Sequence, residues 1–105
     1  MASHRAVAHH FGANLVKARE RANLSQEELG LRASLHRTEV GLLERGARVP
    51  RIDTLVKLAS ALSVPVGCAL LDGITWEPGR IEPGQFDARG GEEPGDETNT
   101  APQVP

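Results

Sequence analysis

The fold is decided by residues 24–43, whose sequence is LSQEELGLRASLHRTEVGLL. Ser25 stands just before a run of residues with helical spacing, so its hydroxyl can accept a hydrogen bond from the first turn of a helix. Glu28, three residues later, can reach back to the backbone amide of Ser25 and complete a reciprocal cap. We therefore predict a helix that begins at Ser25 and ends near Ala33.

A tight turn and a second short helix follow this one. The turn is predicted at residues 34–35 and the helix over 36–44. In this helix Val40 and Leu43 are spaced so that both face a core. The positions left to point outward are Arg37, Thr38, Glu39, Gly41 and Leu42.

Further helices are predicted on both sides of this pair, over 9–22, 51–62 and 65–71. The first carries an apolar face made of Phe11, Leu15, Ala18 and Ala22. The apolar stripe of the second consists of Ile52, Leu55, Val56, Ala59 and Leu62. No strand pattern is longer than a few residues. The predicted fold class is all-α, a compact bundle of four to five short helices containing a helix-turn-helix, with an irregular C-terminal tail.

The sequence divides into four segments, of which only 9–75 is expected to form the helical domain. Residues 1–8 are short and polar and are predicted to be flexible. Residues 76–86 are predicted to be extended and could pack back on the domain. Their apolar side chains are Trp76, Ile81 and Phe86. Residues 87–105 have almost no apolar content and are predicted to form a disordered acidic tail.

The net charge of −2 hides two regions of opposite charge. Residues 1–75 carry ten basic and seven acidic side chains, a net charge of +3, whereas residues 76–105 carry two basic and seven acidic ones, a net charge of −5. A weakly basic domain suits a polyanion such as nucleic acid. For the tail we expect a solubilising role; competition with DNA for the basic face is the alternative.

Other classes of protein find little support in the sequence. A single cysteine, Cys68, excludes an internal disulfide and a thiolate metal cluster. No apolar run approaches the ~18 residues that span a bilayer, so we expect a soluble, cytoplasmic protein without membrane contact. Because there is no Ser/His/Asp set, metal spacing or glycine-rich phosphate loop, we expect neither an enzyme nor a cofactor. The histidines at positions 4, 9 and 10 lack acidic or thiol partners for a metal.

Three segments together carry a family resemblance. They are LSQEEL at 24–29, LERG at 43–46 followed by Pro50, and LVKLASALSV at 55–64. In order and spacing they resemble the phage-repressor-like (Cro-like, XRE-type) helix-turn-helix family over about 60 residues. Two departures stand out. Ser34 replaces the usual turn glycine, which suggests a slightly different turn, and Gly41 with Leu42 replaces a small polar residue.

The resemblance implies that the second helix of the motif lies in the major groove of DNA. The base-reading candidates are Arg37, Thr38, Glu39 and Leu42. Thr38 can serve either a base edge or a phosphate. Arg37 matches the acceptors of guanine, with a phosphate contact as the alternative. Glu39 can accept from a cytosine amino group or pair with a nearby arginine. Leu42 can contact a thymine methyl or pack between helices.

A second set of residues is expected to contact the DNA backbone. The candidates are Gln26, His36, Arg45 and Arg48. Gln26 stands at a helix N-terminus, where free amides favour phosphate, and the resemblance implies the same role. His36 can instead cap its helix, and Arg45 and Arg48 can instead be solvated loop charges.

The resemblance also implies an ion pair between Arg19 and Glu44 that ties the first helix to the end of the recognition helix. A domain of this size makes few base contacts, so we expect a homodimer on a two-fold operator with half-sites about 10 bp or a near multiple apart. The predicted function is a sequence-specific regulator of transcription that binds double-stranded DNA. The alternative is an antitoxin-type protein that binds a partner protein through 76–105 and DNA for autoregulation.

Overall fold

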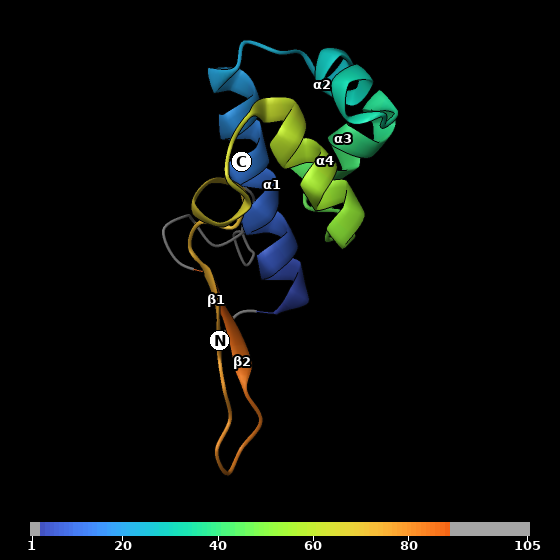
Figure 1. The fold of residues 1–105 in the computed structure, drawn as a ribbon. Coiled ribbons are helices and arrows are strands. Elements are labelled where there is room, and N and C mark those ends of the chain that lie inside the picture. The colour runs from blue at the N-terminus through green and yellow to red at the C-terminus, as the bar shows by residue number, and fades with distance from the viewer. Residues whose placement is uncertain (1–2, 89–105) are drawn as a thin grey trace.

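The computed structural model describes residues 3–88 and contains helices and a small hairpin (Figure 1). In chain order the elements are α1 (His4–Arg21), α2 (Gln26–Ala33), α3 (Arg37–Glu44), α4 (Ile52–Leu62), the π-helix η1 (Val66–Leu70), β1 (Ile74–Glu77) and β2 (Gln85–Ala88). The predicted class, a compact helical bundle with a helix-turn-helix, is confirmed. The β1–β2 hairpin is an addition that the sequence patterns did not indicate.

The α2–α3 pair forms as its residues predict. Glu28 N donates to Ser25 Oγ at 3.0 Å and Ser25 N donates to Glu28 Oε1 at 2.8 Å, which is the reciprocal cap. After α2, Ser34 takes the left-handed conformation (φ 57°, ψ 45°) that glycine adopts most readily. Ser34, which stands where the family usually has glycine, therefore adopts a strained backbone conformation. At this turn Gly30 lies so close to Leu35 that an added Cβ would be 2.5 Å from its carbonyl oxygen.

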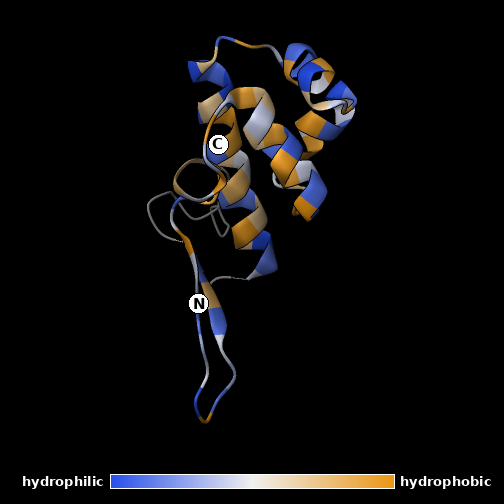
Figure 2. Ribbon diagram, viewed as in Figure 1, coloured by the Kyte–Doolittle hydropathy of each residue, from blue (hydrophilic) through white to orange (hydrophobic). Residues whose placement is uncertain are grey.

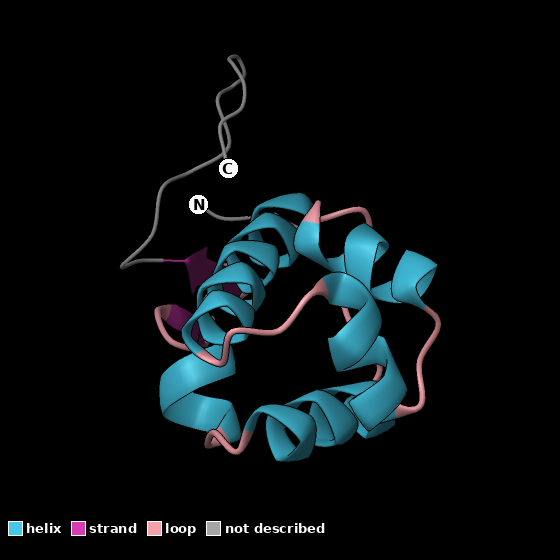
Figure 3. Cartoon of the chain, turned by 90° about the horizontal axis from the view of Figure 1, so that it is seen from above, coloured by secondary structure: helices cyan, strands magenta, loops and turns pink. Residues whose placement is uncertain are grey.

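One hydrophobic core is shared by all the helices. Its largest fully buried side chains are Phe11, Leu15, Leu29, Val40, Leu43, Leu58 and Leu70. In Figure 2 hydrophobic and hydrophilic positions alternate along α1 and α4, as expected for helices with one buried face. From above, the helices surround the core and the hairpin lies at one side (Figure 3).

The predicted buried stripe of α4 is partly wrong. Ile52 is 80% exposed and Val56 is 58% exposed, whereas Thr54 and Leu58 are buried. Val56 is two residues from Leu58 and so lies about 200° round the helix, on its far side. Because both faces of α4 carry apolar residues, periodicity alone did not identify the face that meets α2 and η1.

The first helix begins at His4, five residues earlier than predicted, so residues 4–8 are helical rather than a flexible end. The side chain of Ser3 accepts a hydrogen bond from Ala6 N at 3.2 Å and caps the helix. Ala6 is buried together with Ala88 of β2, and the half-buried Phe86 packs against this pair. Tertiary contact with the hairpin thus extends the helix beyond its own apolar stripe.

The hairpin pairs β1 and β2 in antiparallel register, with Ile74 opposite Ala88 and Trp76 opposite Phe86. The two rings meet edge to face, 4.9 Å between centroids. The Pro/Gly-rich residues 78–84 form the connecting loop. Residues 76–86, expected to be extended, therefore pair with each other, and β2 includes residues 87–88 of the predicted tail. The rest of that tail, 89–105, lies outside the described residues.

The fifth predicted helix, 65–71, is present as the shorter π-helix η1, and polar side chains of α1 hold its end. Asn14 Nδ2 donates to the carbonyl oxygens of Leu70 and Asp72, both at 3.0 Å. His10 Nε2 lies 2.8 Å from the same oxygen of Asp72. These bonds anchor the connection from η1 to the hairpin on α1. Within residues 3–88, no helix is both long and apolar enough to cross a membrane.

Candidate nucleic-acid interface

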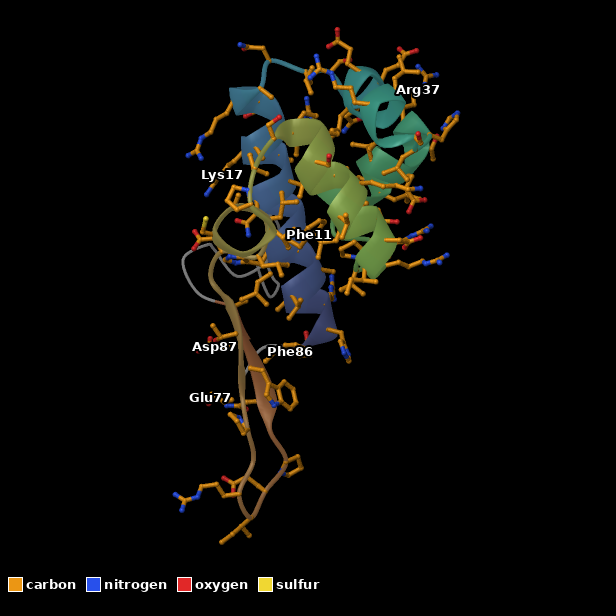
Figure 4. All side chains as sticks on the ribbon, viewed as in Figure 1. Phe11, Lys17, Arg37, Glu77, Phe86 and Asp87 are labelled. Carbon is orange, nitrogen blue, oxygen red and sulfur yellow. The ribbon has the colours of Figure 1, made fainter. Side chains whose placement is uncertain are left out.

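The N-terminal part of α3 is uncovered. Arg37 and Thr38 are exposed, Glu39 and Leu42 are half-buried, and Val40 and Leu43 are buried as predicted. Figure 4 shows Arg37 on the opposite side of the molecule from Lys17. Gly41 is the correction, because it is buried although it was expected to point outward.

The side chains of Gln26 and Arg45 lie over Gly41. A Cβ at this position would lie 3.4 Å from Arg45 Nη1 and 3.6 Å from Gln26 Oε1. Two of the expected phosphate contacts, from α2 and from the end of α3, are therefore close together. Gly41 does not offer its own backbone to a ligand, since these side chains cover it.

His36 caps α3 through its side chain, as one of its two alternatives proposed. Thr38 N donates to His36 Nδ1 at 3.1 Å. A ring nitrogen that accepts this bond carries no proton, so in the neutral ring the proton is on Nε2. His36 is exposed. Its Nε2–H can thus donate to a phosphate while the cap remains in place.

Two weak ion pairs cross the exposed face. Arg37 Nη1 lies 4.0 Å from Glu27 Oε1, with both side chains more than 60% exposed. Arg48 Nη1 lies 3.4 Å from Glu39 Oε1. Exposed pairs of this kind contribute ~1 kcal/mol or less, so neither arginine is prevented from reaching another anion. The arginine partner named as an alternative for Glu39 is present in the form of Arg48.

The orientation of α3 is held by a junction around Glu44, whose side chain is only 5% exposed. Arg19 donates to both carboxylate oxygens, from Nε at 2.6 Å and from Nη2 at 3.1 Å. Gln26 Nε2 donates to Oε1 at 2.8 Å. The Glu44 side chain therefore links α1, α2 and α3, and the hydrogen bond from Arg19 raises the pKa of that guanidinium, outweighing its desolvation.

Close backbone contact reinforces this junction. A Cβ added to Gly12 of α1 would lie 2.5 Å from the carbonyl oxygen of Glu44 and 2.6 Å from that of Leu43. Only glycine lets α1 approach the end of α3 so closely. The spacing of apolar residues gave no signal for this role of Gly12.

Gln26 keeps a donor for DNA despite its bond to Glu44. Its amide carries two N–H groups, and Glu44 accepts from one of them. The contact also fixes the direction of the Gln26 side chain at the N-terminus of α2. Among residues 3–88 no group of three or more His, Cys, Asp or Glu side chains could hold a metal ion.

Comparison with known proteins gives a family model, described as helix-turn-helix, that matches residues 15–67. The control protein C.BamHI of Bacillus amyloliquefaciens is 38% identical over 55 residues, which are 51% of this chain and 68% of that protein. The control protein C.SmaI of Serratia marcescens is 48% identical over 44 residues, 42% of this chain and 52% of that protein.

A solved structure shares this fold. The restriction-modification controller protein C.AhdI of Aeromonas hydrophila superposes with a TM-score of 0.55 and 37% identity. The superposition covers 56% of this chain and 89% of C.AhdI. The similarity thus extends over nearly the whole of that protein.

Proposed function

The chain belongs to the XRE-type helix-turn-helix family of DNA-binding transcription regulators, and from this premise we propose that it binds duplex DNA sequence-specifically through α3. The observation that carries the proposal is the exposed Arg37–Thr38 edge of a helix whose other side is locked by Glu44. A rigidly held helix with polar side chains at its free N-terminus is what the major groove admits.

Four side chains of α3 are assigned to the bases. Arg37 is proposed to bind guanine O6 and N7 through its planar fork, because its contact with Glu27 is long and exposed. Thr38 and Leu42 lie one turn apart on the same side of α3, and Leu42 is proposed to contact a thymine methyl. Glu39 has two alternatives, a cytosine amino group or the Arg48 ion pair, and a preference for cytosine at one position would select the first.

Four further side chains are assigned to phosphates. They are Gln26, His36, Arg45 and Arg48. This set is supported by the closeness of the Gln26 and Arg45 side chains, which lie over Gly41, and by the Nε2–H that His36 keeps available. Phosphate contacts set register and strength without reading sequence.

To test these assignments, an operator is first selected by binding from a pool of random duplexes. Affinity is then measured for this operator and for random DNA. Arg37→Ala should cost ~1–3 kcal/mol on the operator and relax the preference at one base pair. Arg48→Ala should weaken binding to all sequences alike. It should also reduce the salt slope, which is the slope of the log binding constant against the log salt concentration, by about one. Lys17→Ala, on the opposite side from Arg37, is the control. Equal losses on both DNAs with Arg37→Ala would contradict direct readout.

We propose a homodimer on a two-fold operator with half-sites ~10 bp apart. An exposed apolar strip supports it, made of Val49 before α4 and Ile52 and Val56 on α4. The occupant we propose for this strip is the same strip of a second copy, since isologous contacts are the commonest in homodimers. Ile52→Asp should shift the sedimentation of the protein to that of a monomer, whereas Ile81→Asp in the hairpin loop should not.

The regulatory role to test first is control of restriction-modification genes, because the relatives include a restriction-modification controller protein. A reporter gene under the selected operator should respond to the protein and lose the response with Arg37→Ala. No change in reporter output with the parent protein would contradict the role.

Binding of a partner protein through 76–105 is the second candidate. Its support is the exposure of two large apolar side chains of the hairpin, Trp76 at 53% and Ile81 at 98%. If this is the main role, Ile81→Asp should abolish capture of the product of an adjacent gene without affecting DNA binding. Retained capture would contradict it.

A further inference from the structure

The first turns of α1 lie against the loop that follows α3. Gly46 in this loop has φ +75°, and an added Cβ would be 2.8 Å from His9 Cα and 3.1 Å from His9 Cδ2. Arg5 lies one turn earlier on the same face of α1, about 6 Å along the helix axis. Arg5 therefore lies one turn of α1 beyond the place where this helix meets the loop, which carries Arg45 and Arg48.

Arg5 adds a positive charge to this border between α1 and the loop. Arg5 is exposed, and within residues 3–88 no carboxylate forms an ion pair with it. Burial lowers the pKa of His9, and the positive charge of Arg5 lowers it further. The contribution of Arg5 to this shift reflects a positive potential beside His9, and a positive potential attracts an anion.

The hairpin holds this part of α1 in place. Ala6, next to Arg5, is buried against Ala88, and the His4 and Phe86 rings are 5.5 Å apart between centroids. Both the first turns of α1 and the hairpin lie outside residues 15–67, which the family model matches. They are thus extensions of the shared domain that contact each other.

We propose that Arg5, with His9 beside it, forms an additional phosphate-binding site for the DNA backbone, and that the hairpin positions this site by holding the first turn of α1. The inference rests on the proposed DNA binding. Phosphates of one strand follow at ~3.4 Å along the duplex axis, so an arginine about 6 Å beyond His9 reaches a phosphate close to those contacted by the loop. The guanidinium fork matches phosphate oxygens in a bidentate way.

The experiment measures the affinity of four proteins for the selected operator and for random DNA between 50 and 200 mM salt. They are the parent, Arg5→Gln, Arg37→Ala and the control Lys17→Gln, which changes the same charge on the same helix. Arg5→Gln should bind both DNAs about five-fold less tightly, with a salt slope smaller by about one. Lys17→Gln should bind like the parent.

A second arm tests the role of the hairpin with Phe86→Ala, alone and combined with Arg5→Gln. Phe86→Ala should weaken binding to both DNAs, and the double variant should bind no more weakly than Arg5→Gln. Thermal unfolding followed by circular dichroism verifies that each variant is folded.

The outcomes separate the inference from the function on which it rests. If Arg5→Gln binds like Lys17→Gln while Arg37→Ala loses operator preference, the Arg5 site is wrong and the proposed function stands. Additive losses in the double variant overturn the role of the hairpin. If the parent protein binds neither DNA at 50 mM salt, both the inference and the proposed function are wrong.

Discussion

Two of the regions that hold α1 against the rest of the molecule do so by different means. The Glu44 junction, made of Gly12, Arg19, Gln26 and Glu44, combines backbone contact with a bidentate ion pair in a mostly buried place. The hairpin contact relies on two buried alanines, a half-buried phenylalanine and a pair of rings. The comparison teaches that the junction sets the direction of α3, whereas the hairpin contact adds to a fold that is already specified.

The largest effect is expected at the junction from Glu44→Ala. Arg19, whose side chain is 16% exposed, would lose its carboxylate partner in a place where water compensates poorly. The free energy of unfolding, measured with urea, should fall by about 3 kcal/mol. Lys17→Ala on the exposed side of α1 is the control and should change it by less than about 0.5 kcal/mol. Equal effects of the two variants on the free energy of unfolding would contradict the structural role of the Glu44 junction.

Two glycine substitutions test the role of close backbone contact at the junction. Gly12→Ala should destabilise by about 2 kcal/mol, because the added methyl group overlaps two carbonyl oxygens. Gly41→Ala adds the same group where the nearest atom is the flexible end of Arg45. It should therefore stabilise α3 by about 1 kcal/mol. Chemical denaturation of both variants measures the two signs, and a shared sign would contradict this account of the junction.

At the hairpin contact a smaller loss is expected. Phe86→Ala removes a half-buried ring that packs on Ala6 and Ala88. It should lower the free energy of unfolding by about 1 kcal/mol, less than a fully buried phenylalanine would. Hydrogen exchange should accelerate at the amides of the first turn of α1 and stay unchanged in α3. Faster exchange throughout α3 would show that the two regions are not separable.

The smallest effect concerns pH. The pKa of His9 is lowered in the folded protein, first by burial and then by Arg5, so the unfolded chain takes up a proton more readily. The contribution of His9 to stability is therefore present above the ordinary pKa of 6.5 and is lost as the pH falls below it. Between pH 7 and pH 5, His9→Gln should lose less stability than the parent. Identical pH profiles from thermal melts would contradict the assignment.

Much of the domain follows from local chemistry. We could predict the cap of α2 because it needs only two residues three positions apart. The helical repeat of ~3.6 residues likewise predicts that Val40 and Leu43 are buried while Arg37 and Thr38 are exposed. The Arg19–Glu44 pair, which the resemblance implied, is present in the structure.

The predictions from the sequence are wrong at positions where long-range packing determines which residues are buried. Ile52 and Val56 are as apolar as the residues that are buried, so only the placement of α4 against the other helices distinguishes its two faces. The start of α1 at His4 depends on Ala88, more than 80 residues along the chain. Gly41 is buried because side chains from α2 and from the end of α3 fold over it.

What the sequence determined by itself is the order of the helices, the cap of α2 and the exposed Arg37–Thr38 edge of α3, since each rests on residues close together in the chain. Tertiary structure alone decided how closely α1 meets α3, which face of α4 is left bare and that residues 74–88 pair and brace the N-terminal turn. Those features arise from atoms distant in the chain that come within van der Waals distance only after folding, and no local pattern encodes such distances.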